Sequence, residues 1–198
     1  MWRAAAAGLP VTVHRPSRIA GDSRSGACQT DDYLWRVVKG CVQAGAYPDD
    51  VRVLTDLVPV DHVGAAIVAL SHDPRALGRA HHLVNPRPVP LSEVLDHVRA
   101  FGYELAGLPF ARWARAVAAD PDNAAYPLLG VLESSAEAAG ELRFAQDETA
   151  ALLEPAALRC AAIDAELLHR HLSHFVDTGF LPAPVRPHHH NDATRDHS

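Results

Sequence analysis

The stretch HRPSRIAGDSRSG, residues 14–26, concentrates the side chains of this sequence that are best suited to bind a ligand. It carries Arg15, Arg18 and Arg24 directly after a short β-branched run that predicts a strand. The carboxyl end of a strand in an α/β sheet is the usual ligand-binding edge, and the planar arginine guanidinium can bind phosphate through two hydrogen bonds. The alternative is a surface loop held by arginine–aspartate pairs, for instance Arg18 with Asp22.

A second candidate group is the carboxylate in the segment PVDHV, residues 59–63. Asp61 stands near the start of an apolar run that predicts a helix. A carboxylate that caps a helix satisfies a free backbone N–H and contributes about 1 kcal/mol. Helix capping is therefore one role that the sequence predicts for Asp61.

Two histidines, His171 and His174, are three residues apart on one face of a predicted helix, a spacing that metal ligands can have. Neither a cysteine nor an acidic cluster nearby completes such a site, so we expect no bound metal. The three cysteines, Cys28, Cys41 and Cys160, are odd in number and form no CxxC pair. This pattern favours buried, reduced thiols.

The predicted elements alternate strand and helix in the first third of the chain and are mostly helical after it, as in an α/β protein. The expected strands are at residues 9–15, 51–58 and 79–86, and the expected helices are at residues 31–45, 60–71, 91–102, 108–120 and 163–179. Residues 1–8 resemble the end of a further helix. Asp31 or Asp32, Ser92 and Asp164 are the expected N-caps, and Gly45, Gly102 and Gly179 the expected ends.

The composition excludes several classes of protein. The chain has 198 residues, a hydrophobic share of 48% and a formal net charge of −6, as expected of a globular protein with one domain or one lobe of a larger one. An acidic chain without a basic face is a poor nucleic-acid binder. The sequence has neither a signal peptide nor an apolar run long enough for a membrane span, so we expect a soluble, cytoplasmic protein.

Five segments, in this order, resemble the C-terminal half of an extended short-chain dehydrogenase/reductase, and most closely the thioester reductase domain that ends many non-ribosomal peptide synthetases and polyketide synthases. That domain is similar to the reductase of carboxylic acid reductases. The segments are GLPVTVHRPSRIAGDSRSGA, DDYLWRVVKGCVQAGAYPD, LVPVDHVGAAIVALS, HHLVNPRPVPLSEVLDHVRAFGYELAGLPFARW and DAELLHRHLSHFVDTGFLPAP. The resemblance implies a Rossmann-like α/β fold with few strands at the front and a mostly helical substrate-binding part behind.

Two motifs of that family are absent from these 198 residues. A glycine-rich turn holds the cofactor pyrophosphate in the family, and a Tyr-x-x-x-Lys pair does its proton chemistry. None of the four tyrosines has a lysine four residues later, and GDSRSG does not match the glycine pattern. We therefore expect residues 1–185 to be the C-terminal, substrate-binding part of such a domain without its dinucleotide-binding half, and residues 186–198 to be a disordered polar tail.

The resemblance assigns expected roles to the loop. Pro16, Ser17 and Ile19 would lie beside the nicotinamide of NADP(H), which the intact family domain binds. Arg18 would face the substrate. Together with Arg15 and Arg24 it could also meet the phosphate of a phosphopantetheine arm on a carrier protein.

Asp61 has a second expected role, because the segment PVDHV lines the floor of the active site in the family. This role and helix capping are compatible. His62 stands where the family usually has an aromatic residue, which favours packing over catalysis.

Three functions remain open at this point. The first is the substrate-binding part of an NAD(P)H-dependent thioester reductase, which releases a carrier-bound acyl or peptidyl thioester as an aldehyde or alcohol and is inactive alone. The second is a non-catalytic remnant that docks a carrier protein or a partner reductase. The third is a fragment of another extended reductase or epimerase. We expect no nucleic-acid or membrane partner.

Overall fold

The computed structural model describes residue 3, residues 6–137 and residues 144–184. Arg3 and Ala6 are helical, Ala7 N–H donates to the Arg3 carbonyl, and Gly8 has a φ of 83°. This agrees with the expected helix end. The predicted tail, residues 186–198, lies outside the described residues.

The chain folds into short strands and α-helices of 7 to 13 residues, with short 3-10 helices between some of them. The strands are β1 (Val13–Pro16), β2 (Arg18–Ala20), β3 (Ala46–Pro48), β4 (Leu54–Thr55), β5 (Leu57–Pro59), β6 (Ala80–Leu83), β7 (Val89–Pro90) and β8 (Ala106–Leu108). The main helices are α2 (Tyr33–Ala44), α3 (Val60–Ser71), α4 (Leu91–Phe101), α5 (Phe110–Ala118), α6 (Leu129–Glu137) and α8 (Ala165–Asp177), and α7 (Asp147–Leu153) is shorter.

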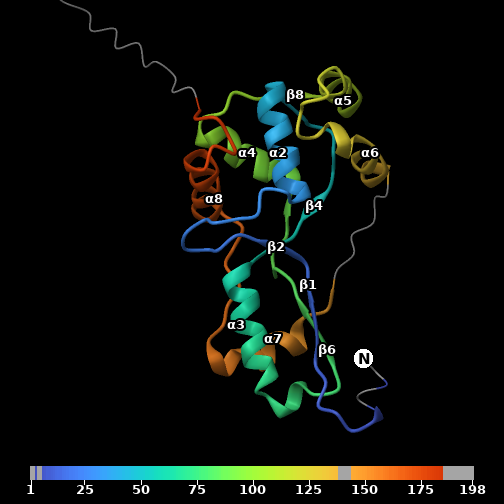
Figure 1. Cartoon of the computed structure of the whole chain (residues 1–198), viewed down its shortest axis with the longest axis vertical. Helices are drawn as coiled ribbons and strands as arrows, with labels where there is room; N and C mark the ends of the chain where they lie inside the picture. The colour runs from blue at the N-terminus through green and yellow to red at the C-terminus, as the bar shows by residue number, and fades with distance from the viewer. Residues whose placement is uncertain (1–2, 4–5, 138–143, 185–198) are drawn as a thin grey trace, which may run out of the picture.

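Strands β1 and β2 are one path through the middle of the molecule, bent at Ser17 (Figure 1). β1 pairs in parallel with β6, and β2 pairs in parallel with β5. The Ser17 N–H still donates to the Leu83 carbonyl at 3.0 Å, so the bend switches the neighbouring strand without breaking the ladder. The two pairings bring the carboxyl ends of β2 and β5 to the same place, which is where the candidate loop begins.

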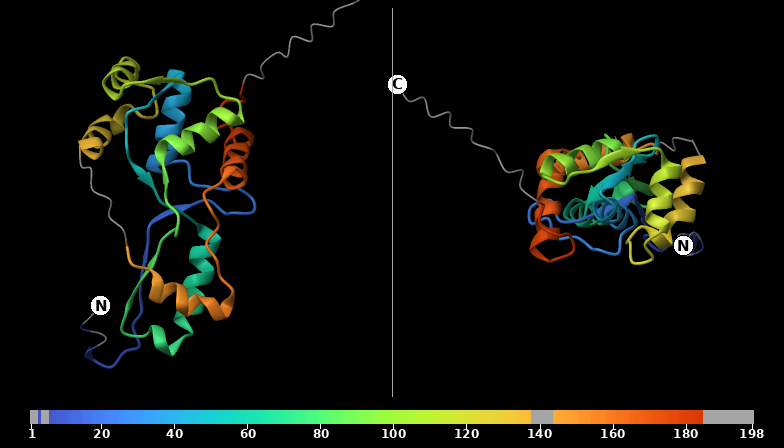
Figure 2. Two further views of the ribbon diagram at one scale, coloured as in Figure 1. Left: turned by 180° about the vertical axis from the view of Figure 1, so that it is seen from behind. Right: turned by 90° about the horizontal axis from the view of Figure 1, so that it is seen from above.

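The molecule is elongated, with two groups of helices on either side of these central strands (Figures 1 and 2). The larger group contains α2, α4, α5, α6 and α8, and its core includes the fully buried aromatic side chains of Trp35, Trp113 and Phe175. The smaller group packs α3 and α7 against β5 and β6 around a second core, to which Val58 and Leu70 belong. The predicted α/β class, with a few strands in front of a mostly helical part, is confirmed.

The expected helix ends agree with the structure in part. Asp32 and Asp164 are N-caps: each side chain accepts a backbone hydrogen bond from the first turn of its helix. Gly45 and Gly102 are C-caps. The expected cap at Ser92 is wrong, because α4 begins one residue earlier with Pro90 as its N-cap residue and no side-chain cap.

The strand predictions were less accurate. The expected strand at residues 9–15 begins four residues before β1 and overlaps it at residues 13–15, and the expected strand at residues 51–58 forms the two pieces β4 and β5. Pro59 ends β5 and precedes α3. Among the described residues, no helix is long and apolar enough to cross a membrane.

Asp164→Ala should lower the free energy of unfolding by about 1 kcal/mol, because the Asp164 carboxylate accepts from Leu167 N–H at 2.9 Å at the start of α8. Ser92→Ala is the matched control, since Ser92 was an equally good candidate cap but caps nothing. Urea unfolding of both variants measures the difference. Equal losses for the two variants would contradict the assigned caps.

Candidate functional site

Arg18, at the start of β2, contacts one acidic and one aromatic neighbour. Its Nη1 donates to both carboxylate oxygens of Asp32, at 3.1 Å each, and its guanidinium lies over the Tyr33 ring, 5.3 Å from the centroid. The side chain is about one third exposed. The alternative pair of Arg18 with Asp22 is therefore wrong, because the bend at Ser17 directs Arg18 toward the start of α2 instead.

Asp22 shapes the turn that follows β2. Its Oδ1 accepts hydrogen bonds from the backbone N–H groups of Arg24 and Ser25 and from the Ser25 hydroxyl. These bonds, those from Ser25 first, lower the pKa of Asp22. The Arg24 guanidinium lies 3.9 Å from Asp22, and the Arg24 side chain is 84% exposed. The turn thus presents Arg24 to solvent.

Asp61 ties this turn to the first turn of α3. Its carboxylate accepts from the Ser23 N–H at 2.9 Å and from the Ser23 hydroxyl at 2.7 Å. Desolvation raises the pKa of Asp61, but the bonds from Ser23 outweigh it and the net pKa is lowered. The expected cap at Asp61 is wrong: α3 begins at Val60 with Pro59 as the N-cap residue, and no side chain caps it.

Ser23→Ala should lower the free energy of unfolding at pH 7 by about 1 kcal/mol, because it removes a hydrogen bond to a carboxylate. The folded-state pKa of Asp61 is depressed, so this stability is present above its ordinary pKa of 3.8 and is lost as pH falls through the lowered value. The difference between wild type and variant should therefore shrink in acid. Urea titrations at about pH 7 and pH 3 measure it, with the exposed Ser71→Ala as control. A difference independent of pH would contradict the assigned bond.

Helix α8 contacts the turn that follows β2. Arg170 donates from Nη1 to the Ser23 carbonyl at 2.7 Å. His171 is buried, stacks on Trp35 with ring centroids 5.5 Å apart, and is bonded through Nδ1 to the Leu167 carbonyl. Burial lowers the pKa of His171, which favours a neutral packing residue. The part of the chain that the structure describes has no cluster of three or more His, Cys, Asp or Glu side chains that could hold a metal.

The bend itself carries Pro16, Ser17 and Ile19. The Ser17 hydroxyl is buried and has no hydrogen-bond partner of standard geometry, although it faces Asp56 closely enough to lower the pKa of that carboxyl in part. Burial raises the pKa of Asp56 more strongly, so the net shift is upward. Asp56 also accepts from the Asn85 N–H at 2.8 Å. Ile19 is 43% exposed, which is unusual for a large apolar side chain.

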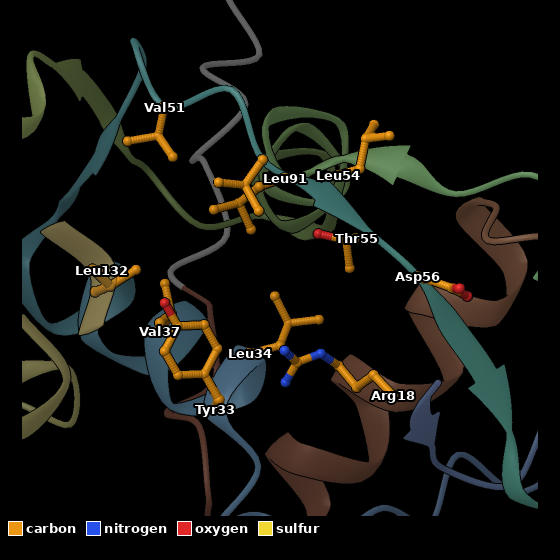
Figure 3. A pocket seen from close by; sticks show the side chains of 11 residues that line it. Arg18, Tyr33, Leu34, Val37, Val51, Leu54, Thr55, Asp56, Leu91 and Leu132 are labelled. Atoms are coloured by element: carbon orange, nitrogen blue, oxygen red, sulfur yellow. The ribbon is translucent and has the colours of Figure 1, made fainter. Parts of the chain in front are cut away.

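A pocket of about 240 Å³ opens beside Arg18 (Figure 3). Its wall comes from β2, α2, the segment around β4, α4 and α6. The lining residues are Arg18, Tyr33, Leu34, Val37, Val51, Val53, Leu54, Thr55, Asp56, Leu91 and Leu132. Figure 3 shows the Arg18 guanidinium pointing toward the apolar side chains across the hollow. Such a concave, mostly apolar site with a few polar groups is the usual form of a small-ligand site.

The structure brings together only some of the predicted site residues. Arg18 lines the pocket, whereas Asp61 lies at the far side of the turn, bonded to Ser23. Arg15 is exposed on β1 and Arg24 is exposed at the turn, so neither lines the pocket. The sequence reasoning missed Tyr33 and Thr55 as pocket residues. Tyr33 could have been considered, because it follows the Asp32 cap at the start of the first helix after the candidate loop.

The comparisons with known proteins agree with this geometry. A family model described as male sterility protein, an NAD-binding family, matches residues 1–67. The isonitrile lipopeptide synthase of Streptomyces coeruleorubidus is 36% identical over 193 residues, which are 92% of this chain and 13% of that protein.

Two solved structures have the same fold. The terminal R domain from the myxalamid PKS-NRPS biosynthetic pathway superposes with a TM-score of 0.83 at 39% identity, over 92% of this chain and 48% of that one. A thiolation-reductase di-domain from an archaeal non-ribosomal peptide synthetase superposes with a TM-score of 0.73 at 20% identity, over 90% of this chain and 38% of that one. The chain thus spans about half of the myxalamid domain and a smaller share of the other relatives.

The family model and the matches over nine tenths of the chain agree with one another. Together they show that the chain belongs with the thioester reductase domains of the extended short-chain dehydrogenase/reductase superfamily.

Proposed function

We propose that this chain is the substrate-binding part of an NAD(P)H-dependent thioester reductase. The observation that carries the proposal is the apolar pocket whose polar end is Arg18, which follows the carboxyl end of β1 by two residues. In α/β proteins this is the edge at which ligands bind. The 39% identity to the myxalamid terminal domain supports the same reading.

The residues at the bend fit one face of a nicotinamide cofactor. The exposed Ile19 can pack on a flat ring, and the backbone at Ser17 would lie beside the carboxamide. Pro16 fixes the backbone before Ser17. When bound, the cofactor would supply the two electrons of each reduction. Asp61 supports this surface through Ser23 rather than by contact with a ligand.

The arginines of the loop suit a carrier-protein substrate. Arg24 is almost fully exposed, with only a long contact to Asp22, and Arg15 is also exposed. Either guanidinium could donate hydrogen bonds to the phosphate of a phosphopantetheine arm. The archaeal relative is a thiolation-reductase di-domain, which supports a carrier-protein partner. The free cysteines fit a reducing compartment such as the cytoplasm.

In this proposal a thioester, one NADPH and one proton give an aldehyde, a free thiol and NADP⁺, and a second such reduction gives an alcohol. This chain's part is to hold the acyl group in the pocket and to exclude water from it. Arg18 offers its guanidinium to the carbonyl end of the substrate. The Tyr-x-x-x-Lys pair and the glycine-rich turn of the family do not occur in the 198 residues.

The purified chain should bind NADPH weakly, because a glycine-rich turn at a helix N-terminus carries most of the pyrophosphate recognition in such folds. Calorimetric titration of NADPH into the chain measures this. We expect a dissociation constant above about 100 μM, which is a binding free energy weaker than about −5.5 kcal/mol. A low-micromolar constant would show that these residues hold a complete dinucleotide site.

The proposed function is tested by complementation. The chain is co-expressed with the nucleotide-binding half of the related myxalamid domain, and NADPH oxidation is followed at increasing concentrations of an acyl thioester on a carrier protein. Turnover that needs both halves and the thioester supports a reductase. A stable complex with the carrier and no turnover would support a docking module instead.

A further inference from the structure

We infer that the pocket beside Arg18 selects an uncharged, apolar acyl group of about six carbons, with the thioester at the Arg18 end. This inference rests on the proposed function, and it adds the substrate class. It follows from the chemistry of the pocket wall, from the charges at its margin and from its volume.

The wall is aliphatic on every side but one. Leu34 and Val37 come from the first turns of α2, Val53 from the strand segment before β4, Leu91 from the start of α4 and Leu132 from α6. Figure 3 shows Leu34 beside the Arg18 guanidinium and Leu91 across the hollow from it. Each methylene that enters such a wall from water gains about 0.8 kcal/mol. The wall therefore favours an alkyl chain.

The charges at the margin are already paired. Arg18 donates from Nη1 to both oxygens of Asp32, so the Asp32 carboxylate is already paired and does not offer itself to a cation on the substrate. Asp56 accepts from the Asn85 N–H, and Figure 3 shows its carboxylate directed away from the hollow, where it is a poor partner for a cation inside the pocket. No other acidic or basic side chain lines the described pocket. An ammonium group on the substrate would be buried here without a partner, which is costly.

The volume limits the length of the acyl group. A pocket of about 240 Å³ holds about eight groups of the size of a water molecule. A hexanoyl group with the oxygen and sulfur of its thioester has eight non-hydrogen atoms. A much longer chain would have to leave the pocket and return to water.

The test measures binding of acyl pantetheines to the purified 198-residue chain by calorimetry. The probes are butanoyl-, hexanoyl-, dodecanoyl- and 5-aminopentanoyl-pantetheine, the last of which replaces the terminal methyl of hexanoyl by an ammonium. We expect hexanoyl to bind at least tenfold more tightly than 5-aminopentanoyl, about tenfold more tightly than butanoyl, and no less tightly than dodecanoyl.

Two valines provide matched variants. Val53→Phe fills the pocket and should weaken hexanoyl binding at least tenfold, whereas Val68→Phe, on the 60% exposed outer side of α3, should leave it unchanged. Leu54→Phe, at a more exposed lining position, replaces Val53→Phe if thermal melting shows that the latter does not fold.

Equal or tighter binding of 5-aminopentanoyl, equal effects of the lining and control variants, or no measurable hexanoyl binding would each overturn the inference. The complementation assay separates this from the proposed function. Turnover that prefers 5-aminopentanoyl would leave the reductase standing with the wrong substrate class. Selective hexanoyl binding without turnover in the complemented protein would leave the pocket standing and remove the reductase.

Discussion

Gly26→Ala is expected to lower the free energy of unfolding by roughly 2–5 kcal/mol, the largest effect of any single change considered for this chain. Gly26 closes the turn that follows β2, where its N–H donates to the Asp22 carbonyl and its φ is 74°. An added Cβ would lie 2.2 Å from the Arg170 carbonyl oxygen, which belongs to the backbone of α8. The energy of this clash therefore adds to the energy of placing an alanine in a left-handed backbone conformation, because neither the turn nor the backbone of α8 can shift without cost.

Gly78→Ala is the matched control for this change. Its φ of 73° is the same within a degree, but nothing lies within 4 Å of its added Cβ. Gly78→Ala should lower the free energy of unfolding only through backbone strain, by about 1–2 kcal/mol. Chemical denaturation of both variants gives the difference. Equal losses would show that the turn is not packed on α8, and the support of the site by that helix would be wrong.

Arg18→Ala in the complemented reductase is expected to reduce kcat/KM for a carrier-bound thioester by about ten- to a hundredfold, equivalent to 1.5–3 kcal/mol of lost charge-assisted contact. Cofactor affinity should barely change, because none of the proposed cofactor residues lines the pocket. Stability should fall by less than about 1 kcal/mol, since the ion pair with Asp32 is partly exposed.

The control for Arg18 is Arg75→Ala, which removes a surface arginine that is paired with Asp73 in the smaller group of helices, away from the pocket. It should leave kcat/KM unchanged. Arg18→Lys keeps the charge but loses the guanidinium fork, and should recover only part of the activity. Wild-type turnover in Arg18→Ala would reduce the role of this residue to its ion pair with Asp32.

The long helices could be predicted from the sequence because their signals are local. Periodic apolar residues and the caps Asp32 and Asp164 fix α2 and α8 within a few residues. The strands are two to four residues long, and their positions depend on partners distant in the chain. Periodicity cannot detect such short pieces, which is why the bounds predicted for β1 were inaccurate and β2, β3, β7 and β8 were missed.

The site could be predicted in position but not in its contacts. The sequence located the ligand-binding edge at the end of the first strand, and Arg18 does line a pocket there. The partner of Arg18 was wrong because Asp22, four residues away, seemed the nearest acid, whereas the bend at Ser17 and the cap geometry bring Asp32 to it. The apolar wall was missed because it gathers side chains from five separate elements.

The central claim is that this chain presents a thioester for reduction. The most direct measurement supplies NADPH deuterated at the transferred position to the complemented protein, together with hexanoyl thioester on a carrier protein. Mass spectrometry then follows the released product. The account predicts hexanal or hexanol with deuterium on the former thioester carbon, and none without this chain. Release of hexanoic acid alone, or of unlabelled product, would contradict it.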